Sequence, residues 1–393
     1  MELTTKQLEG LKTAIERYEL CEKYTVISGY AGTGKSTLVK FIIEALSSYG
    51  IDPETDVCYA TYTGKAAQVL LKKGNRNVCT LHKLLYESIP KPDGTFFRRV
   101  KPEIEYKVVV VDDVSMAPKE MMNLLFSHPI YVICLGDPFQ LPPVDKDADN
   151  GLLAHPHIFL DQIMRQAEES EIIRLSMQIR HQEPIEYQKG KDVIVLPKEE
   201  LNTGMLMWAD QILVGTNATR ININNQMRQL LNRGDKPENG DKVICLRNYW
   251  DNLADNEDPL VNGTIGYISN IYDTFYKYPK YICDRKIDIV NANFVSDSNA
   301  DFGPLDMDKQ MILTGESALD RRELFKIGRN IRTKNMIPFQ FTYGYAITTH
   351  KAQGSSWPKV LVIEERFPFD KTEHARWLYT AITRSEDKIV LCR

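Results

Sequence analysis

The chain has 393 residues, 43% of them hydrophobic and 26% charged, so it is long enough for two or three globular domains with cores of their own. A net charge of −4 excludes a uniformly basic nucleic-acid-binding protein, so any nucleic acid must bind at a local patch. The seven cysteines form no C-x-x-C pair, and the sequence has neither a membrane-length apolar run nor a signal-peptide pattern. We therefore expect no zinc site, no disulfide framework, no membrane partner and a cytoplasmic location.

An amphipathic helix is expected at the start of the chain, because Leu8, Leu11 and Ile15 recur at roughly helical spacing. Gln7 lies near its first turn. Its amide can donate and accept hydrogen bonds together, as reading an adenine edge requires. Capping of the helix is the interpretation that the residues alone favour.

The strongest motif is a complete Gly-x-x-x-x-Gly-Lys-Ser phosphate loop at residues 29–36. The apolar run at residues 24–28 predicts a strand before it, and the apolar face of residues 36–46 predicts a helix after it. Glycines let the backbone turn N–H groups toward phosphate oxygens, and the helix N-terminus adds positive partial charge. Lys35 can reach the β- and γ-phosphates, and the Ser36 hydroxyl can ligate Mg²⁺. The expected nucleotide-binding residues are Gly32, Thr33, Gly34, Lys35, Ser36 and Thr37.

A second strand is expected at residues 57–60, and it leads into the polar sequence Thr-Tyr-Thr-Gly-Lys. Hydroxyls and a lysine at the carboxyl end of a strand suit contact with phosphate groups. Simple helix capping explains the same residues equally well. The residues concerned are Thr61, Thr63 and Lys65, and His82 lies in a similar Thr-Leu-His sequence.

Residues 87–105 predict a small β-hairpin insertion. Three prolines interrupt the stretch, and Pro92-Asp93-Gly94 is typical of a turn. Phe96 and Phe97 precede two arginines, a combination that suits stacking on bases. The alternative is that one phenylalanine packs into a satellite core.

The apolar run at residues 108–111 predicts a buried parallel strand that ends in Asp112-Asp113. This is a Walker B arrangement, in which Asp112 holds Mg²⁺ together with Ser36, and Asp113 orients or deprotonates the attacking water. The next strand leads to Gln140, which is placed to sense the γ-phosphate.

The rest of the chain predicts a second α/β domain with a β-rich insertion. Arg165 could bind a phosphate, although a surface ion pair is the default for a single arginine. Strands separated by turns are expected at residues 272–335, where we favour a core position for four tyrosines over a base-stacking surface. Thr348, Thr349 and His350 form a polar loop that suits a phosphate backbone, and Arg384 could reach across an interface to the nucleotide. The four tyrosines are Tyr272, Tyr276, Tyr278 and Tyr281.

The chain resembles a superfamily 1B helicase of the RecD and Dda type in six segments that occur in the family's order. The resemblance covers nearly the whole chain and is far more specific than the phosphate loop alone. The segments are residues 29–36, 60–67, 112–113, 136–143, 343–356 and 377–384.

The resemblance implies an α/β protein with two RecA-like parallel-sheet domains, one at residues 1–167 and one at residues 168–259 together with 336–393. A duplex-splitting pin is implied at residues 85–106 and an SH3-like β-barrel at residues 260–335. Gln7 resembles the family's adenine-reading glutamine, and Arg165 and Arg384 resemble its two arginine fingers. The implied catalytic set is Lys35, Asp113, Gln140, Arg165 and Arg384. The implied nucleic-acid contacts are Thr61, Thr63, Lys65, His82, Phe96, Phe97, Thr348, Thr349 and His350.

The implied function is an ATP-dependent DNA helicase that moves 5′ to 3′ on single-stranded DNA and unwinds duplex, with ATP and Mg²⁺ as cofactors. ATP would be hydrolysed in the cleft between the two RecA-like domains. Expected partners are single-stranded DNA and duplex junctions, with a single-strand-binding protein as a further candidate. We expect a monomer in the cytoplasm of a bacterial or phage-infected cell. A translocase that strips proteins without unwinding, an RNA helicase and a non-enzymatic nucleotide switch are the alternatives.

One residue departs from the family pattern. The second Walker B carboxylate is usually Glu, and here it is Asp113. Its carboxylate lies one methylene closer to the backbone, so the position of the attacking water is expected to shift by roughly 1 Å. The sequence therefore predicts a slower hydrolysis step.

Overall fold

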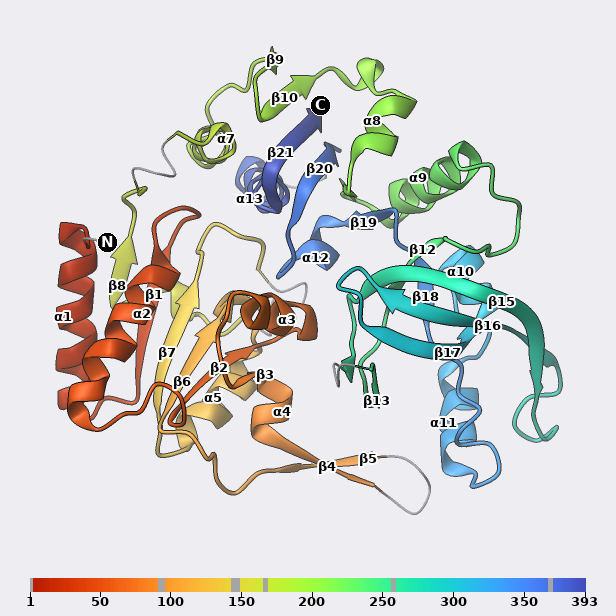
Figure 1. Cartoon of the computed structure of the whole chain (residues 1–393), viewed down its shortest axis with the longest axis horizontal. Helices are drawn as coiled ribbons and strands as arrows, with labels where there is room; N and C mark the ends of the chain where they lie inside the picture. Colours follow the sequence, from red (N-terminus) through yellow and green to blue (C-terminus); the bar gives the residue numbers. More distant parts are fainter. Residues whose placement is uncertain (1–2, 91–95, 143–148, 165–168, 256–258, 367–369) are drawn as a thin grey trace. The chain divides into compact units, whose positions relative to one another are not determined.

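The computed structural model describes residues 3–90, 96–142, 149–164, 169–255, 259–366 and 370–393 (Figure 1). The chain divides into two compact units. Unit 1 contains Met1–Tyr86, Val100–Leu201 and Ala352–Arg393, and unit 2 contains Glu87–Arg99 and Asn202–Lys351. The domain limits inferred from the sequence stay a prediction. No helix in the described ranges combines the length and apolar character that crossing a bilayer requires.

Unit 1 contains a six-stranded parallel sheet in the order β3-β2-β6-β7-β1-β8. The expected strands before the phosphate loop and before Asp112 are both confirmed, as β1 and β6. Both lie in the sheet interior, which explains their nearly continuous apolar sequences. The strands are β1 (Tyr24–Gly29), β2 (Val57–Thr61), β3 (Val78–Thr80), β6 (Val108–Asp112), β7 (Tyr131–Gly136) and β8 (Ile158–Leu160).

Helices cover both faces of this sheet (Figure 1). On one face α1 and α2 place Ala14, Leu38 and Ile42 against the strands. On the other face α4 and α5 contribute Leu85 and Leu125 to a second core. The arrangement confirms a mixed α/β fold with a parallel-sheet core. The helices of this part are α1 (Thr5–Glu19), α2 (Lys35–Leu46), α3 (Gly64–Lys72), α4 (Leu81–Leu85) and α5 (Lys119–Ser127).

Residues 171–196 and 357–392 of unit 1 add further strands and two helices. Strand β21 pairs in parallel with β10 on one side and β20 on the other, and β9 runs antiparallel to β10. The long helix α13 is buried along most of its length, including Trp377, Tyr379 and Ile382. The elements are α7 (Glu171–Arg180), β9 (Gln188–Lys189), β10 (Val193–Leu196), β20 (Trp357–Ile363), α13 (Lys371–Ile382) and β21 (Ser385–Cys392).

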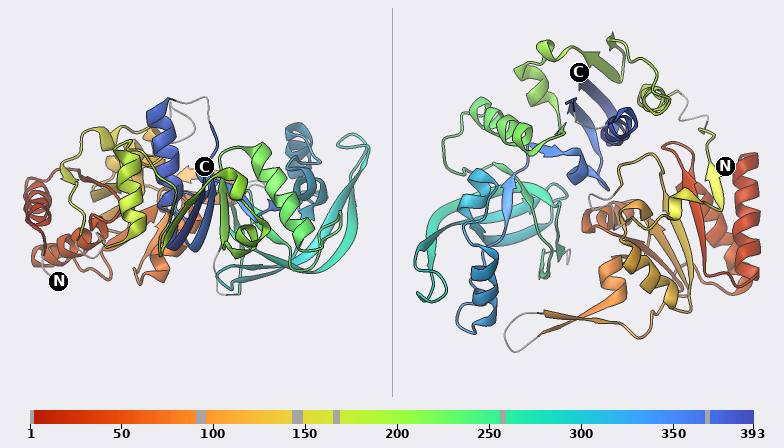
Figure 2. Two further views of the ribbon diagram at one scale, coloured as in Figure 1. Left: turned by 90° about the horizontal axis from the view of Figure 1, so that it is seen from above. Right: turned by 180° about the vertical axis from the view of Figure 1, so that it is seen from behind.

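Unit 2 is built mainly on a five-stranded antiparallel sheet in the order β17-β16-β15-β12-β18 (Figure 2). Strands β11 and β19 pair in parallel, and the Asn224 amide of helix α9 donates to the Ala346 carbonyl of β19. The strands of unit 2 are β11 (Gln211–Val214), β12 (Lys242–Cys245), β13 (Tyr249–Leu253), β14 (Pro259–Leu260), β15 (Ile265–Lys277), β16 (Lys286–Ser296), β17 (Asp301–Asp308), β18 (Phe341–Tyr343) and β19 (Ala346–Thr348). The helices of unit 2 are α8 (Thr203–Trp208), α9 (Asn217–Leu230), α10 (Lys309–Thr314) and α11 (Arg321–Arg329). Helix α12 (Thr349–Ala352) begins in unit 2 and ends one residue beyond it.

Residues 272–335 contain the expected strands, β16 and β17, and they also contain two helices that the sequence did not predict, α10 and α11. Helix α11 begins at a capping box in which Asp320 and Glu323 bond each other's backbone N–H groups, and this local pairing favours a helix. The tyrosines divide in the same region. Tyr278 is buried and Tyr276 is partly buried, whereas Tyr272 and Tyr281 are exposed, so the core interpretation holds only for the first two.

The predicted hairpin is present as a two-stranded sheet of β4 (Tyr86–Pro90) and β5 (Phe96–Val100). Glu87 and Arg99 form an ion pair across its base with a 2.7 Å separation. The backbone of Phe96 and Phe97 lies in β5, but the side chains of residues 88–98 lie outside the described part of the chain. A role as a duplex-splitting pin therefore stays a proposal.

Candidate nucleotide-binding site

The phosphate loop joins β1 to α2 at the carboxyl end of the sheet. Gly34 has a φ of 77° at the N-cap of α2, a left-handed conformation that glycine adopts without a steric penalty. A Cβ atom there would also lie 2.5 Å from the Gln7 amide nitrogen, so a larger residue would displace the Gln7 side chain. The Lys35 amine donates to the carbonyls of Gly29 and Tyr30 at 2.7 and 2.9 Å. The amine therefore lies over the loop, where the sequence predicts phosphate binding.

Gln7 is buried against this loop. Its amide oxygen accepts the Thr4 N–H at 3.0 Å, and the Thr4 hydroxyl accepts the Gln7 N–H, so the capping interpretation is confirmed. The Gln7 amide nitrogen points to the carbonyls of Thr33 and Gly34, each 3.4 Å away. This side chain thus connects the first helix to the phosphate loop. Adenine recognition by Gln7 stays a prediction.

Asp112 and Asp113 lie where β6 ends. Burial of the Asp112 carboxyl group and the neighbouring charge of Asp113 raise the pKa of Asp112 to about 6, while Lys35 opposes the shift. The Ser36 hydroxyl and the Asp112 carboxylate are hard oxygen donors. They fit Mg²⁺, which takes few protein ligands and completes its shell with water and nucleotide phosphates. Within the described ranges, no group of three or more His, Cys, Asp and Glu side chains forms another metal site.

The raised pKa leads to a stability prediction for Asp112→Asn. The cost of ionising Asp112 in the metal-free protein is complete above its folded-state pKa of about 6, and it is lost only as pH falls to the ordinary value of 3.8. We expect the variant to gain roughly 3 kcal/mol of unfolding free energy at pH 8 and roughly half of that at pH 5. Denaturant unfolding of both proteins at the two pH values, without Mg²⁺, measures the difference. An equal gain at both pH values would contradict the explanation.

The backbone explains part of the departure at Asp113, whose φ is 49°. Asp tolerates this left-handed conformation better than Glu does, because its short polar side chain bonds locally. We predict that Asp113→Glu raises kcat for ATP hydrolysis and lowers the unfolding free energy by about 1 kcal/mol. Steady-state ATPase and denaturant unfolding measure the two effects. An unchanged or lower kcat would show that the shorter side chain does not slow hydrolysis.

A buried polar bridge connects α13 to the phosphate loop. The Tyr379 hydroxyl accepts the Ala31 N–H at 2.9 Å and donates to Asp137 at 2.6 Å. Asp137 also accepts the Phe139 N–H at 2.9 Å, and the ring of Phe139 meets that of Tyr379 edge-on. Burial raises the pKa of Asp137, and the charge of Lys35 and the Tyr379 hydrogen bond oppose the rise. The bridge makes the loop conformation sensitive to the position of α13.

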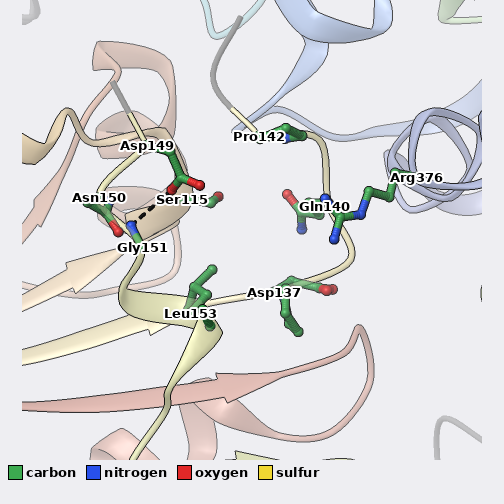
Figure 3. A pocket seen from close by; sticks show the side chains of 11 residues that line it. Ser115, Asp137, Gln140, Pro142, Asp149, Asn150, Gly151, Leu153 and Arg376 are labelled. Atoms are coloured by element: carbon green, nitrogen blue, oxygen red, sulfur yellow. Dashed lines mark hydrogen bonds between the residues drawn. The ribbon is translucent and has the colours of Figure 1, made fainter. Parts of the chain in front are cut away.

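Gln140 lines a cavity of about 330 Å³ that opens beside this bridge (Figure 3). Arg376 of α13 extends toward Gln140 in the same cavity, and Ser115 and Asp149 face them from the other side. The Arg376 Nε has no hydrogen-bond partner among the described residues. The cavity therefore brings the predicted γ-phosphate sensor together with a guanidinium group that the sequence did not single out.

Arg384 lies just beyond the end of α13 and is buried. Its guanidinium donates to the carbonyls of Thr380 and Ser355 and to the Thr383 hydroxyl at 3.0, 3.4 and 3.1 Å. Burial lowers the pKa of Arg384, and the negative charges of Asp113 and Asp137 oppose this effect. The structure thus brings Arg384 near both carboxylates. The other predicted finger, Arg165, lies outside the described residues.

The predicted strand contacts in unit 1 come from the ends of β2 and β3. The Thr63 hydroxyl accepts the Ala66 N–H as the N-cap of α3, so the capping interpretation is confirmed for this residue. Thr61 is buried and donates to the Thr63 carbonyl at 2.7 Å. Lys65 is also buried, whereas the ring of His82 lies near those of Tyr62 and Tyr86, with centroids 5.7 and 6.2 Å away. Gly354 approaches the start of α3 so closely that a Cβ atom there would lie 3.1 Å from the Thr63 hydroxyl.

The predicted contacts in unit 2 lie at the end of β19. Thr348 is its last residue and is partly exposed. The Thr349 side chain is buried at the start of α12, with its hydroxyl 3.5 Å from the Val214 carbonyl. Burial lowers the pKa of His350, which keeps this imidazole neutral near pH 7. Contact of these residues with nucleic acid stays a prediction.

Sequence reasoning missed several residues of the site. Asp137 could have been found, since a carboxylate at the carboxyl end of a strand next to the phosphate loop is a recognisable signal. Tyr379 and Arg376 gave no such signal. Their positions in the sequence of the helix do not distinguish them from ordinary residues that pack into a core. No pattern in the sequence singled out Arg180 of α7, whose guanidinium lies 3.6 Å from the centre of the Tyr30 ring.

Together, the parallel sheet, the phosphate loop and the two carboxylates define a P-loop nucleotide-binding protein. A model of the AAA domain matches residues 2–194, and a model of the UvrD-like helicase C-terminal domain matches residues 343–392. By these matches the chain is similar to superfamily 1B helicases of the RecD/Dda/Pif1 type.

Two curated relatives and one solved structure illustrate this similarity. The ATP-dependent RecD2 DNA helicase of Deinococcus radiodurans is 27% identical over 93% of this chain and 46% of its own. The ATP-dependent DNA helicase Dda of phage T4 is 29% identical over 39% of this chain and 36% of its own. The chain thus spans less than half the length of these relatives. A Bacteroides Pif1 helicase, solved with ADP-AlF3 and ssDNA, shares the fold with a TM-score of 0.53 and 17% identity over 100% of this chain and 92% of its own.

Proposed function

We propose that the protein is an ATP-dependent DNA helicase that moves 5′ to 3′ along single-stranded DNA and unwinds duplex. In this proposal ATP binds between the phosphate loop and α13, which the sequence assigns to two different RecA-like domains. Single-stranded DNA and duplex junctions are the proposed substrates, and a monomer is the proposed active form. The 5′ to 3′ direction rests on the family resemblance.

The hydrogen bonds of Tyr379 carry the proposal. This residue of α13 joins the Ala31 N–H of the phosphate loop to Asp137 at the end of β7. A second connection lies nearby, because the Leu141 N–H donates to the Thr380 hydroxyl and Gln353 donates to the Leu141 carbonyl. A nucleotide that rearranges the loop must therefore also displace α13 and the segment around Gln353. Such a coupling is what converts nucleotide binding into movement along a strand.

Each residue of the site has a proposed chemical task. Lys35 and the loop N–H groups bind the phosphates, and Ser36 and Asp112 hold Mg²⁺, which would neutralise charge on the phosphate oxygens. Asp113 positions the attacking water and accepts its proton. Arg384 places a guanidinium near the transferred phosphoryl group, where its positive charge stabilises the transition state more than the ground state.

The energetic requirement is modest. Opening one DNA base-pair step costs about 1.4 kcal/mol. A ligand moves a two-state equilibrium by its differential affinity for the two states, and several kcal/mol are available when a γ-phosphate gains arginine contacts. One nucleotide-driven movement of α13 is therefore sufficient for one step.

The β4–β5 hairpin is the proposed wedge, and this leads to a prediction for Phe96→Ala/Phe97→Ala. Removing both rings should lower the rate of fork unwinding at least about tenfold, because base stacking at the junction disappears. Strand-stimulated ATPase should change less than twofold, since the hairpin lies outside the nucleotide site. Gel-based unwinding and ATPase assays on one preparation measure both rates. Equal losses in the two assays would assign the phenylalanines a structural role.

The test of the proposal as a whole is ATP-dependent unwinding of a forked DNA by the wild-type chain. ATPase that single-stranded DNA stimulates, together with strand separation, is the expected result. Stimulated ATPase without strand separation would instead support a translocase that displaces proteins. Stimulation by RNA alone would replace DNA as the proposed substrate.

A further inference from the structure

The sequence around α11 is strongly basic in a chain that is acidic as a whole. Residues 321–334 contain six Lys and Arg residues and one Glu, whereas the chain has a net charge of −4. Arg322, Phe325, Lys326 and Arg329 are all exposed at positions i, i+3, i+4 and i+7 of the helix. They therefore form one continuous stripe along α11. We call this stripe, together with Tyr281 and Ile331, the basic face.

The opposite side of α11 fixes the helix to the unit 2 core. Ile327 is fully buried, and with the partly buried Leu324 it packs against Tyr278, Ile282 and Leu319. The capping box at Asp320 and Glu323 fixes the first turn. The cations of the basic face thus stand on a rigid element, so a ligand would not have to order them first.

The carboxylates of Glu323 and the preceding Asp320 do not cancel the charge of this segment. Glu323 receives the Arg285 guanidinium on both oxygens at 2.6 and 2.9 Å, and this contact lowers the pKa of Glu323. Asp320 accepts the Glu323 N–H as the helix N-cap. In the described part of the chain, Arg321, Arg322 and Arg332 have no carboxylate within ion-pair distance. The field over the stripe is therefore positive and falls off slowly at low salt.

Aromatic and apolar side chains stand among these cations. Phe325 is 59% exposed, and the Arg329 guanidinium lies 4.4 Å from its ring centre. Tyr281 is 68% exposed, its hydroxyl accepts the Asn330 amide, and its carbonyl accepts the Lys326 amine. Ile331 is 74% exposed beside them. Two aromatic rings and an isoleucine are thus exposed together among the cations of one surface.

We infer that the basic face binds single-stranded DNA outside the strand contacts that the family resemblance implies. The inference rests on the proposed function, because it supplies a second surface for the same substrate. Arginine guanidinium groups pair with backbone phosphates, and exposed rings offer flat surfaces on which bases stack. A duplex presents phosphates but no free base faces, so it would leave Phe325 and Tyr281 unused. Cations and exposed rings together therefore favour single-stranded DNA over duplex DNA as the ligand.

The test is the salt dependence of strand binding by the full-length chain, measured without nucleotide as fluorescence anisotropy of a labelled oligo-dT. Removing one cation that pairs with a phosphate of a single strand lowers the slope of log K against log salt by about 0.7. Arg322→Ala/Lys326→Ala/Arg329→Ala should therefore lower the slope by about 2. The matched control is Lys12→Ala/Lys23→Ala/Lys40→Ala, which removes three exposed cations from unit 1 and should leave the slope unchanged.

The aromatic part of the face has its own test. Phe325→Ala should weaken oligo-dT binding about tenfold with an unchanged slope, and Phe325→Trp should retain affinity. Bromodeoxyuridine photocrosslinking should attach the strand to Tyr281 or Phe325.

Four results would overturn the inference. The first two are an unchanged slope in the triple variant and an equal change of slope in the control variant. The third is an effect of the substitutions that is confined to a blunt duplex of the same length. The fourth is displacement of the strand by poly-glutamate as efficiently as by unlabelled oligo-dT, which would indicate an acidic protein partner. Basal ATPase without DNA should be the same in every variant, which confirms folding. A wild-type chain that binds the strand through this face without unwinding would refute the helicase proposal alone.

Discussion

Lys35→Ala is expected to reduce ATP hydrolysis by at least about 1000-fold and to abolish unwinding. The amine lies over the phosphate loop, 2.7 Å from the Gly29 carbonyl, and it is the group that the motif assigns to the β- and γ-phosphates. Without it, the charge that develops on the transferred group loses its nearest cation. Steady-state ATPase with saturating single-stranded DNA measures the effect.

The matched control for this experiment is Lys40→Ala, which removes an exposed lysine from the same helix. It should retain full activity, and equal thermal midpoints for the two variants would show that both are folded. Strand-stimulated ATPase that survives in Lys35→Ala would contradict the nucleotide site itself, and the proposed function would fail with it.

Arg384→Ala is expected to lower kcat by about 1000-fold with a much smaller change in KM for ATP. The guanidinium is buried near Asp113 and Asp137, and its three hydrogen bonds fix it within α13 and the segment before β20. A cation fixed in this way stabilises charge in the transition state more than in the ground state. Single-turnover hydrolysis separates this effect from product release.

A loss of folding could produce the same result, so Arg384→Lys is the matched variant. It keeps the charge but loses the planar fork that bonds three acceptors. We expect its kcat to stay far below that of the wild-type chain, with a KM for ATP close to the wild-type value. Full activity in Arg384→Lys would show that charge alone is needed, and an unchanged kcat in Arg384→Ala would assign Arg384 a purely structural role.

Much of the nucleotide-binding part could be predicted because its signals are local. The phosphate loop requires a strand before it and a helix after it, and both lie within two residues of the expected limits as β1 and α2. The buried strand that ends in Asp112 carries an uninterrupted run of valines, which only an interior strand of a parallel sheet accommodates.

The bridge at Tyr379 could not be predicted, because it depends on packing between segments far apart in the sequence. Its hydroxyl meets Ala31 and Asp137 across separations of 348 and 242 residues. Nothing in the helical pattern of α13 distinguishes this tyrosine from an ordinary buried residue. Helix α11 was missed for a different reason, since the turn-rich composition around it outweighed a readable capping box.

The most direct test of the account compares two partial duplexes, one with only a 5′ single-stranded tail and one with only a 3′ tail. The account predicts ATP-dependent strand separation from the 5′-tailed substrate and almost none from the 3′-tailed one. Unwinding of the 3′-tailed substrate alone would contradict the proposed direction. Failure on both substrates, with ATPase still stimulated by single strands, would contradict the helicase function.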